Sequence, residues 1–269
     1  MVDAKNEGSH TKKSDQESPK ANKLEKNIIE TIKTILYAGV IALTVRTFAY
    51  EPFNIPSGSM IPTLLVGDYL FVSKFSYGYS ALGTFYNLPS YSGRILGNNK
   101  PQRGDVVVFK LPSNPQIDYI KRIIGLPGDK IQVKDSILYI NGQEAPREYI
   151  GEQIVDDSRG NAERYFLYTE TLPNGIKHPI LESDQGSILD DTEEYQVPAD
   201  HYFMMGDNRD NSQDSRVLEK VGYVPYENLV GKAKYLFFSL APRGTSFEIG
   251  RILNLPQDIR TERMLKSIK

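Results

Sequence analysis

Residues 119–129 read Tyr-Ile-Lys-Arg-Ile-Ile-Gly-Leu-Pro-Gly-Asp. The apolar run ends in Leu-Pro-Gly-Asp, a strong turn signal, so the stretch predicts a β-strand that stops at a tight turn. Successive side chains of a strand point to opposite faces, so Lys121 is expected to share a face with Tyr119 and Ile123, and Arg122 to point the other way. An ammonium group between those neighbours is expected to be poorly hydrated.

Short apolar strand candidates recur along the rest of the chain, and the hairpin dipeptide Asn141-Gly142 closes one of them. Helical periodicity is scarce outside an apolar stretch near the N-terminus and residues 257–269, which are predicted to form a surface helix. The chain is therefore predicted to be mainly β. The further strand candidates are 68–72, 106–109, 131–133, 137–140 and 233–240.

Composition excludes several kinds of site. The 32 Lys and Arg against 34 Asp and Glu give a net charge of −2, so the chain has no basic footprint for nucleic acid. The chain has no cysteine, which excludes disulfides, a thiolate zinc site and a cysteine nucleophile. His10 lies in a polar tail, which leaves His178 and His201 as candidates for a histidine-based site.

The N-terminal region predicts a membrane anchor. Residues 1–27 are almost wholly polar and are predicted to be disordered. Residues 28–50 follow, and their uninterrupted apolar part, 34–45, is short enough for a buried core helix or for the core of a cleaved signal peptide. Lys33 and Arg46 favour a permanent span, because their long side chains can reach the interface and extend the usable length toward roughly 30 Å.

Basic residues give the predicted orientation. After Arg46 the next basic residue is Lys74, whereas the tail is rich in lysine. The positive-inside rule therefore places the N-terminus in the cytoplasm and everything after Tyr50 on the outer side. The lysines of the tail are Lys5, Lys12, Lys13, Lys20, Lys23 and Lys26.

Residues 56–60, Pro-Ser-Gly-Ser-Met, follow the apolar stretch closely and contain a candidate nucleophile. A serine beside glycine can present its hydroxyl in a tight turn, although the same residues also make ordinary loops. Ser59 needs a base, and His178, His201 or a lysine are the alternatives. Lys121 is the favoured lysine, because burial in a strand can bring its pKa from ~10.4 toward 7–8, whereas a solvated edge strand would leave it a surface lysine.

Residues 206–216, Gly-Asp-Asn-Arg-Asp-Asn-Ser-Gln-Asp-Ser-Arg, form the densest polar segment. One interpretation is a calcium loop that starts at Asn208 and ends at Glu219, but its sixth position is Gln213, where the turn needs glycine. Other interpretations are an Asx-rich loop or a buried polar network beside a catalytic group. In such a network Ser212 would bind a lysine, and Asp214 would form an ion pair with Arg216.

Three segments in order, PSGSM-IPTLLVGDYL, RGDVVVF with YIKRIIGLPGD, and GDNRDNSQDSR, resemble the motif boxes of bacterial type I signal peptidases. That family consists of membrane-anchored Ser/Lys endopeptidases that remove signal peptides from exported proteins. The resemblance implies a β-rich catalytic core with a smaller inserted β region, preceded by one N-terminal transmembrane helix. Some relatives have two spans where this chain has one.

By motif position, the resemblance implies that Ser59 is the nucleophile and Lys121 the general base. It implies that the Ser57 hydroxyl and the Ser59 N–H form an oxyanion hole, and that Ser212 orients Lys121. Arg122, Asp214 and Arg216 resemble the supporting salt-bridge cluster. The pockets for small substrate side chains, suited to an Ala-x-Ala site, fall on Phe53, Ile55, Met60, Leu70, Val108, Tyr119 and Ile120.

The remaining expectations concern the organisation and setting of the chain, and residues 78–100 and 140–200 carry none of the family motifs. The catalytic core is expected to be discontinuous, 51–139 with 201–269, with 140–200 as the insertion and 78–100 as a long loop. The expected partners are signal peptides of exported preproteins and the lipid bilayer, with no nucleic acid, no cofactor and no metal, and the chain is expected to be monomeric. The expected location is the bacterial cytoplasmic (inner) membrane, single-pass, with the N-terminus in the cytoplasm and the catalytic domain on the outer, periplasmic side.

Three rival functions are less consistent with the sequence. A self-cleaving Ser/Lys repressor-type protease would carry a DNA-binding domain, which residues 1–50 do not resemble. A β-lactam-type serine enzyme would need Ser-x-x-Lys, which the segment starting at Ser59 lacks. A membrane-anchored binding module with an inactive site would not require Ser59, Lys121 and Ser212 together.

Overall fold

A computed structural model describes residues 19–80, 82, 93–96, 99–156, 162–241 and 258–268. The chain divides into two compact units, residues 1–45 and 46–269. The described part of the first unit belongs to the long helix α1 (Pro19–Phe48), and the second unit is almost entirely β. The prediction of a mainly β protein with a single N-terminal apolar helix is therefore confirmed.

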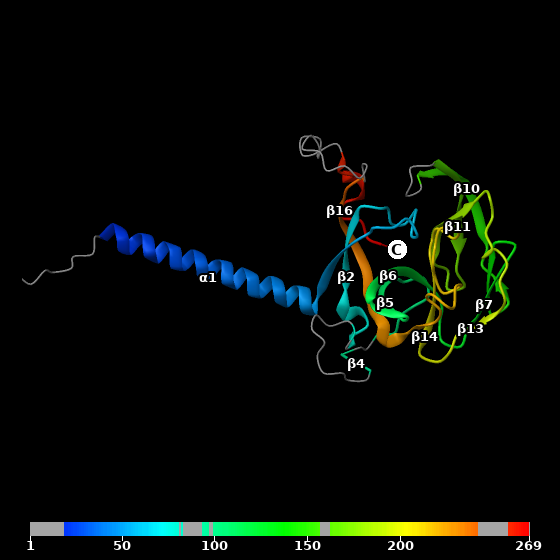
Figure 1. The fold of residues 1–269 in the computed structure, drawn as a ribbon, viewed down its shortest axis with the longest axis horizontal. Helices are drawn as coiled ribbons and strands as arrows, with labels where there is room; N and C mark the ends of the chain where they lie inside the picture. Colours follow the sequence, from blue (N-terminus) through cyan, green and yellow to red (C-terminus); the bar gives the residue numbers. More distant parts are fainter. Residues whose placement is uncertain are drawn as a thin grey trace, which may run out of the picture. The chain divides into compact units, whose positions relative to one another are not determined.

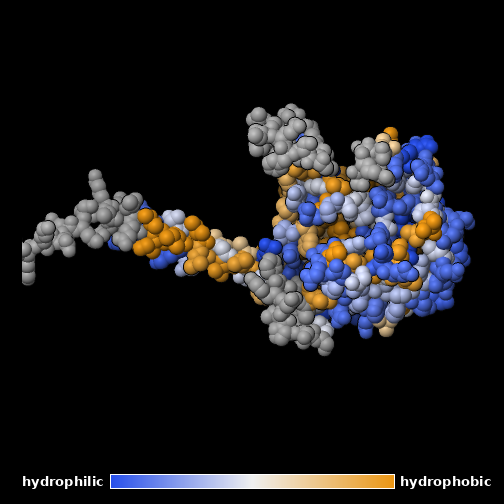
Figure 2. Space-filling view, in the orientation of Figure 1, coloured by the Kyte–Doolittle hydropathy of each residue, from blue (hydrophilic) through white to orange (hydrophobic). Residues whose placement is uncertain are grey.

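Helix α1 carries the apolar stretch and starts earlier than the sequence predicts. Residues 26–48 are long and apolar enough to cross a membrane by length and composition, the one such helix in the described ranges. Their apolar side chains are exposed, and Figure 2 shows them in orange along the helix. The helix begins at Pro19, inside the segment predicted to be disordered, because proline is favourable at a first helical position and Lys, Ala, Leu and Glu propagate a helix well. The rest of the predicted disordered tail, 1–18, lies outside the described residues.

The strands described in the second unit form four antiparallel sheets (Figure 1). The largest has seven strands in the order β1-β2-β16-β5-β6-β14-β15. These strands are β1 (Tyr50–Asn54), β2 (Asp68–Ser73), β16 (Leu229–Ser239), β5 (Val106–Leu111), β6 (Asn114–Gly125), β14 (His201–Met205) and β15 (Val224–Pro225).

Three smaller sheets complete the unit. A four-stranded sheet contains β13 (Tyr195–Gln196), β7 (Lys130–Lys134), β8 (Ile137–Ile140) and β9 (Gln143–Glu144). A three-stranded sheet contains β10 (Arg147–Asp156), β11 (Ala162–Thr171) and β12 (Lys177–Ser183). The pair β3 (Tyr79–Ser80) and β4 (Arg94–Ile95) lies in the predicted 78–100 loop, most of which is outside the described residues. The described residues also include the short 3₁₀ turns η1 (Lys74–Ser76), η3 (Tyr226–Asn228) and η4 (Thr261–Arg263).

Strand β5 shows why the large sheet is buried on both faces. Val106 and Val108 pack into one hydrophobic cluster, and Val107 and Phe109 pack into another. This division follows from the two-residue period of a strand and explains an unbroken apolar run. Strand β6 is different, because its first five residues are exposed and its last five are buried. Lys121 lies at the start of the buried part.

The C-terminal segment differs from the prediction of a surface helix over 257–269. Asp258 is helical, but among residues 259–268 the only helical turn is the three-residue η4. Ile259 forms a β-bridge with Leu240, Ser267 forms one with Tyr235, and Ile268 packs against the core. Ile259 and Ile268, two of the apolar residues whose spacing suggested a helix, therefore make separate contacts along an extended segment.

Candidate active site

Ser59 lies in a tight turn that follows β1. The Ile61 N–H donates to the Gly58 carbonyl (3.1 Å), and the Leu64 N–H donates to the Met60 carbonyl (2.8 Å). Met60 is fully buried and fixes the turn to the core. The Ser57 and Ser59 hydroxyl oxygens are 3.5 Å apart. The turn therefore holds the two serines of the segment side by side.

Lys121 meets this turn from β6. Its Nζ lies 2.6 Å from Ser59 Oγ and also donates to the Ile120 carbonyl at 3.0 Å. The side chain is buried, and the Tyr119 ring lies beside it with the ring centre 5.4 Å from Nζ. Burial lowers the pKa of Lys121 from 10.5 to about 8. A neutral amine at this distance can accept the proton of the Ser59 hydroxyl.

The segment 206–216 supports the Ser59 turn from behind. The Asn208 N–H donates to the Ser59 carbonyl (3.1 Å), and its side-chain amide donates to the Gly58 carbonyl (3.2 Å). A Cβ at Gly206 would lie 2.5 Å from the Ser59 carbonyl oxygen and 2.3 Å from Ser212 Oγ. Only glycine allows the two segments to approach this closely.

Asp214 and Arg216 form the ion pair that the sequence suggests. The Arg216 guanidinium donates to both Asp214 oxygens at 2.9 Å. Burial alone would raise the pKa of Asp214, but the Arg216 guanidinium and the hydrogen bond from the Gly206 N–H hold it below its ordinary value. The Ser212 hydroxyl is buried and makes no hydrogen bond within the described part of the chain, to Lys121 or to any other group.

Arg122 belongs to a different ion pair. Its Nε and Nη2 donate to the two oxygens of Asp207 at 2.8 and 2.7 Å, and its Nη1 donates to the Gly104 carbonyl at 2.7 Å. The Thr63 hydroxyl also donates to Asp207. Sequence reasoning missed Asp207 as the partner of Arg122, although its position in the polar segment was a usable signal.

A cavity of about 540 Å³ opens in front of Ser59 and Lys121. Five of the predicted pocket residues line it: Phe53, Ile55, Val108, Tyr119 and Ile120. The other two, Met60 and Leu70, are not among its lining residues, because both are fully buried in the hydrophobic core. Residues that were not predicted to form the substrate pocket also line the cavity, among them Asn54, Pro56, Ile117, Asp118, Asn211 and Gln213.

The two candidate histidines lie elsewhere. His178 is buried in β12, where its Nε2 is 3.2 Å from Glu170 and its Nδ1 is 3.4 Å from Asp207. His201 Nδ1 contacts the Ala199 carbonyl at 2.7 Å. Neither makes a hydrogen bond to Ser59 in the described part of the chain, whereas Lys121 does.

The calcium-loop interpretation does not fit the structure, because its side chains are engaged elsewhere or lie apart. The Asn208 amide nitrogen donates to the Gly58 carbonyl, Asp210 Oδ2 accepts from the Ser183 N–H at 2.6 Å, and Glu219 is exposed.

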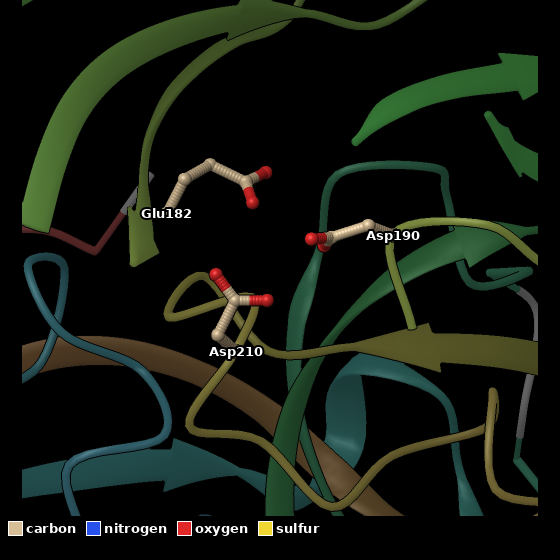
Figure 3. Close-up of side chains that lie close together, drawn as sticks. All are labelled: Glu182, Asp190 and Asp210. Atoms are coloured by element: carbon tan, nitrogen blue, oxygen red, sulfur yellow. The ribbon is translucent and has the colours of Figure 1, made fainter. Parts of the chain in front are cut away.

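Asp210 instead approaches Glu182 and Asp190, and carboxylate oxygens of the three lie within 4.8 Å of one another (Figure 3). Burial raises the pKa of Glu182 to about 8, so this carboxyl group retains its proton in much of the neutral pH range.

Comparison with known proteins identifies the family. Residues 28–238 match the model of the family described as signal peptidase, peptidase S26. A signal peptidase I of Rickettsia typhi (strain ATCC VR-144 / Wilmington) is 38% identical over 261 residues, covering 91% of this chain and 96% of that protein. A signal peptidase I of Rickettsia canadensis (strain McKiel) is 43% identical over 235 residues, covering 83% and 84%. A crystal structure of a signal peptidase I from Enterococcus faecalis V583 is 27% identical, covers 50% of this chain and 97% of that one, and has a TM-score of 0.29, too low to compare folds.

The class of protein defined by these findings is a peptidase. More narrowly, the chain belongs to peptidase family S26, the signal peptidases. The resemblance found in the sequence motifs is confirmed.

Proposed function

We propose that this chain is a membrane-anchored serine endopeptidase that removes N-terminal signal peptides from exported preproteins through a Ser59/Lys121 dyad and an acyl-enzyme. The observation that carries the proposal is the 2.6 Å separation of Lys121 Nζ and Ser59 Oγ at the wall of a cavity. Family membership and the signal peptidase I names of the relatives support the substrate class.

Lys121 acts as the general base in this proposal. Its pKa of about 8 leaves a useful fraction of the amine neutral near pH 7–8. The neutral amine takes the Ser59 proton as Oγ attacks the scissile carbonyl, and the protonated amine then delivers a proton to the leaving amine. The carbonyl carbon remains as an ester on Ser59 until water, deprotonated by Lys121, hydrolyses it.

Ser57 and the Ser59 N–H supply the proposed oxyanion hole. The Ser57 hydroxyl lies 3.5 Å from Ser59 Oγ and lines the same cavity. A donor aimed at the developing negative charge typically contributes ~10²–10³ in rate. Ser212 is proposed to orient Lys121, and its buried hydroxyl has no other hydrogen-bond partner among the described residues.

The cavity walls suit the small apolar side chains of an Ala-x-Ala site. Phe53 and Ile55 come from the β1 side, and Val108, Tyr119 and Ile120 come from β5 and β6. Strand β1 is at an edge of the large sheet as described. An extended peptide that lies between β1 and β6 can therefore reach backbone groups on the outer side of β1. Met60 and Leu70 contribute indirectly, because they pack in one hydrophobic cluster with the wall residues Ile55 and Val108.

The proposed setting is the bacterial cytoplasmic membrane. The exposed apolar surface of α1 between residues 26 and 48 supports one span in the lipid bilayer. The lysine-rich tail supports a cytoplasmic N-terminus, which leaves the catalytic unit on the outer side. The proposed oligomeric state is a monomer.

The test is cleavage of a preprotein with an Ala-x-Ala site by the detergent-solubilised enzyme. Ser59→Ala and Lys121→Ala are each expected to abolish cleavage while circular dichroism and the melting temperature stay close to those of the parent. His201→Ala is the control, because the described hydrogen bond of the His201 side chain is to the Ala199 carbonyl and not to the dyad, and it should retain full activity. Full activity of Lys121→Ala would refute the dyad.

A further inference from the structure

We propose that the inserted three-stranded sheet β10–β12 is a positioning unit for the Ser59 turn, and that Glu170 is its principal positioning residue. The inference rests on the proposed function, because it assigns a role in that same site. It also gives a function to the part of the chain whose role the motifs leave open.

The free edge of β12 binds the polar segment through its backbone. Strand β12 pairs with β11 on one side only. On its other side the Leu181 N–H donates to the Asp207 carbonyl (2.8 Å), and the Arg209 N–H donates to the Leu181 carbonyl (2.9 Å). These bonds form a parallel bridge between Leu181 and Asn208. The inserted sheet thus continues into the segment that supports Ser59.

A buried ion pair fixes this junction. The Arg209 guanidinium donates to both oxygens of Glu170, at 2.7 and 2.5 Å, and both side chains are almost completely buried. Although burial alone would raise the pKa of Glu170, Arg209 and His178 lower it to about 2, so Glu170 is ionised throughout the working pH range. His178 lies between Glu170 and Asp207, at 3.2 and 3.4 Å, and joins this pair to the Asp207–Arg122 pair.

The ion pair is linked to the proposed nucleophile through two short paths. Asn208, next to Arg209, donates to the carbonyls of Gly58 and Ser59. The Arg209 carbonyl accepts from Arg216 Nη2 at 2.5 Å, and Arg216 is one of the charges that act on Lys121. Arg209 therefore connects Glu170 to the support of both members of the dyad.

Apolar packing makes a third connection. Leu181 and Tyr165 of the inserted sheet form a hydrophobic cluster with Ile61, two residues after Ser59. Leu65, at the end of the same turn region, packs against this cluster. The sheet therefore contacts the Ser59 turn directly as well as through the polar segment.

Removing one partner of a buried ion pair leaves an uncompensated charge, so Arg209 is expected to move toward water when Glu170 is neutral. A displacement of about 1 Å at a catalytic group can cost roughly 100-fold in rate. The effect should fall mainly on kcat, because no residue of the inserted sheet lines the cavity and most of its apolar wall comes from β1, β5 and β6, with Asn211 and Gln213 as the contribution of the polar segment.

The experiment compares Glu170→Gln with Arg164→Gln in the full-length enzyme in detergent, with an Ala-x-Ala preprotein as substrate. Arg164 is the matched control, because it lies in the same strand, β11, but forms a largely exposed pair with Asp184. For Glu170→Gln we expect kcat per folded molecule to fall roughly 10- to 100-fold with KM changed less than about 2-fold. For Arg164→Gln we expect both constants to stay at the parent values.

A double variant separates positioning from loss of folding. In Glu170→Gln/Arg209→Gln the two amides can form a hydrogen bond with each other, and no unpaired charge remains buried at this position. The value of kcat should therefore recover at least several-fold relative to Glu170→Gln. If Glu170→Gln does not fold, Glu170→Asp, which keeps the charge but shortens the reach, should show the same fall in kcat. Parent kcat in the folded single variants, or no recovery in the double variant, would overturn the proposal. Failure of the parent enzyme to cleave would instead contradict the proposed function.

Discussion

At Lys121 two effects oppose each other. Burial lowers the pKa of its amine, the carboxylates of Asp214 and Asp207 raise it, and Arg216 lowers it again. The net fall from 10.5 to about 8 corresponds to a free energy on the order of 3 kcal/mol favouring the neutral amine. Desolvation therefore outweighs two nearby negative charges, each of which is already neutralised by an arginine.

This balance predicts the pH dependence of cleavage. Because only neutral Lys121 can accept the Ser59 proton, kcat/KM should rise with pH through about 8 and then level off. The measurement is a pH profile of kcat/KM for a preprotein in detergent. A limb near 10.5, the ordinary lysine value, would contradict a desolvated base.

Gly206 gives a second prediction for single residues. In Gly206→Ala the added methyl group would overlap the Ser59 carbonyl and the Ser212 hydroxyl, so the Ser59 turn must shift. A shift of about 1 Å should lower kcat roughly 100-fold. Gly39→Ala is the control, because a methyl group there meets no atom within 4 Å, and it should leave kcat unchanged. Equal activities of the two variants would show that the close approach is not needed.

Sequence motifs indicated Ser57, Ser59 and Lys121, and the structure brings these three together. The Glu170–Arg209 pair was not predictable, because its members are 39 positions apart and neither lies in a pattern that specifies a partner. Buried ion pairs depend on tertiary contacts, which leave no local periodicity in the sequence.

Among the elements, strands were easier to predict than the C-terminal segment. Strands β5 and β6 follow from unbroken apolar runs and turn signals, whereas residues 258–268 have sparse apolar positions that fit a helix equally well. Tertiary contacts decide the outcome. Arg263 binds the Asp68 carboxylate at 2.5 Å and the Thr63 carbonyl at 3.0 Å, which ties the segment to the start of β2.

This tie should stabilise the catalytic unit. Arg263→Ala leaves buried Asp68 without its cation and is expected to lower the free energy of unfolding by about 1–3 kcal/mol. Urea denaturation of the detergent-solubilised protein measures this change. The matched control is Lys266→Ala, three residues later and exposed, which should change stability by less than about 0.5 kcal/mol. A comparable small change for Arg263→Ala would mean that the segment is not an anchor.

At the scale of the whole molecule, the chain joins an apolar helix to a β-rich unit, and the proposed orientation can be tested because the chain has no cysteine. A single cysteine can be introduced as Lys12→Cys in the tail or as Ile188→Cys at a side chain that is 93% exposed. With a membrane-impermeant maleimide on intact spheroplasts, only Ile188→Cys should be labelled. Labelling of Lys12→Cys alone would show that the chain has the opposite orientation and would contradict the proposal.

The central claim, that Ser59 is the nucleophile of a peptidase with a lysine base, is tested most directly by trapping the acyl-enzyme. The enzyme is mixed with a preprotein, quenched in acid within one turnover, digested and analysed by mass spectrometry. The account predicts that the peptide containing Ser59 carries the C-terminal acyl fragment of the signal peptide as an ester on Oγ, and that Ser59→Ala gives neither adduct nor cleavage. Cleavage by Ser59→Ala, or an adduct on another residue, would contradict it.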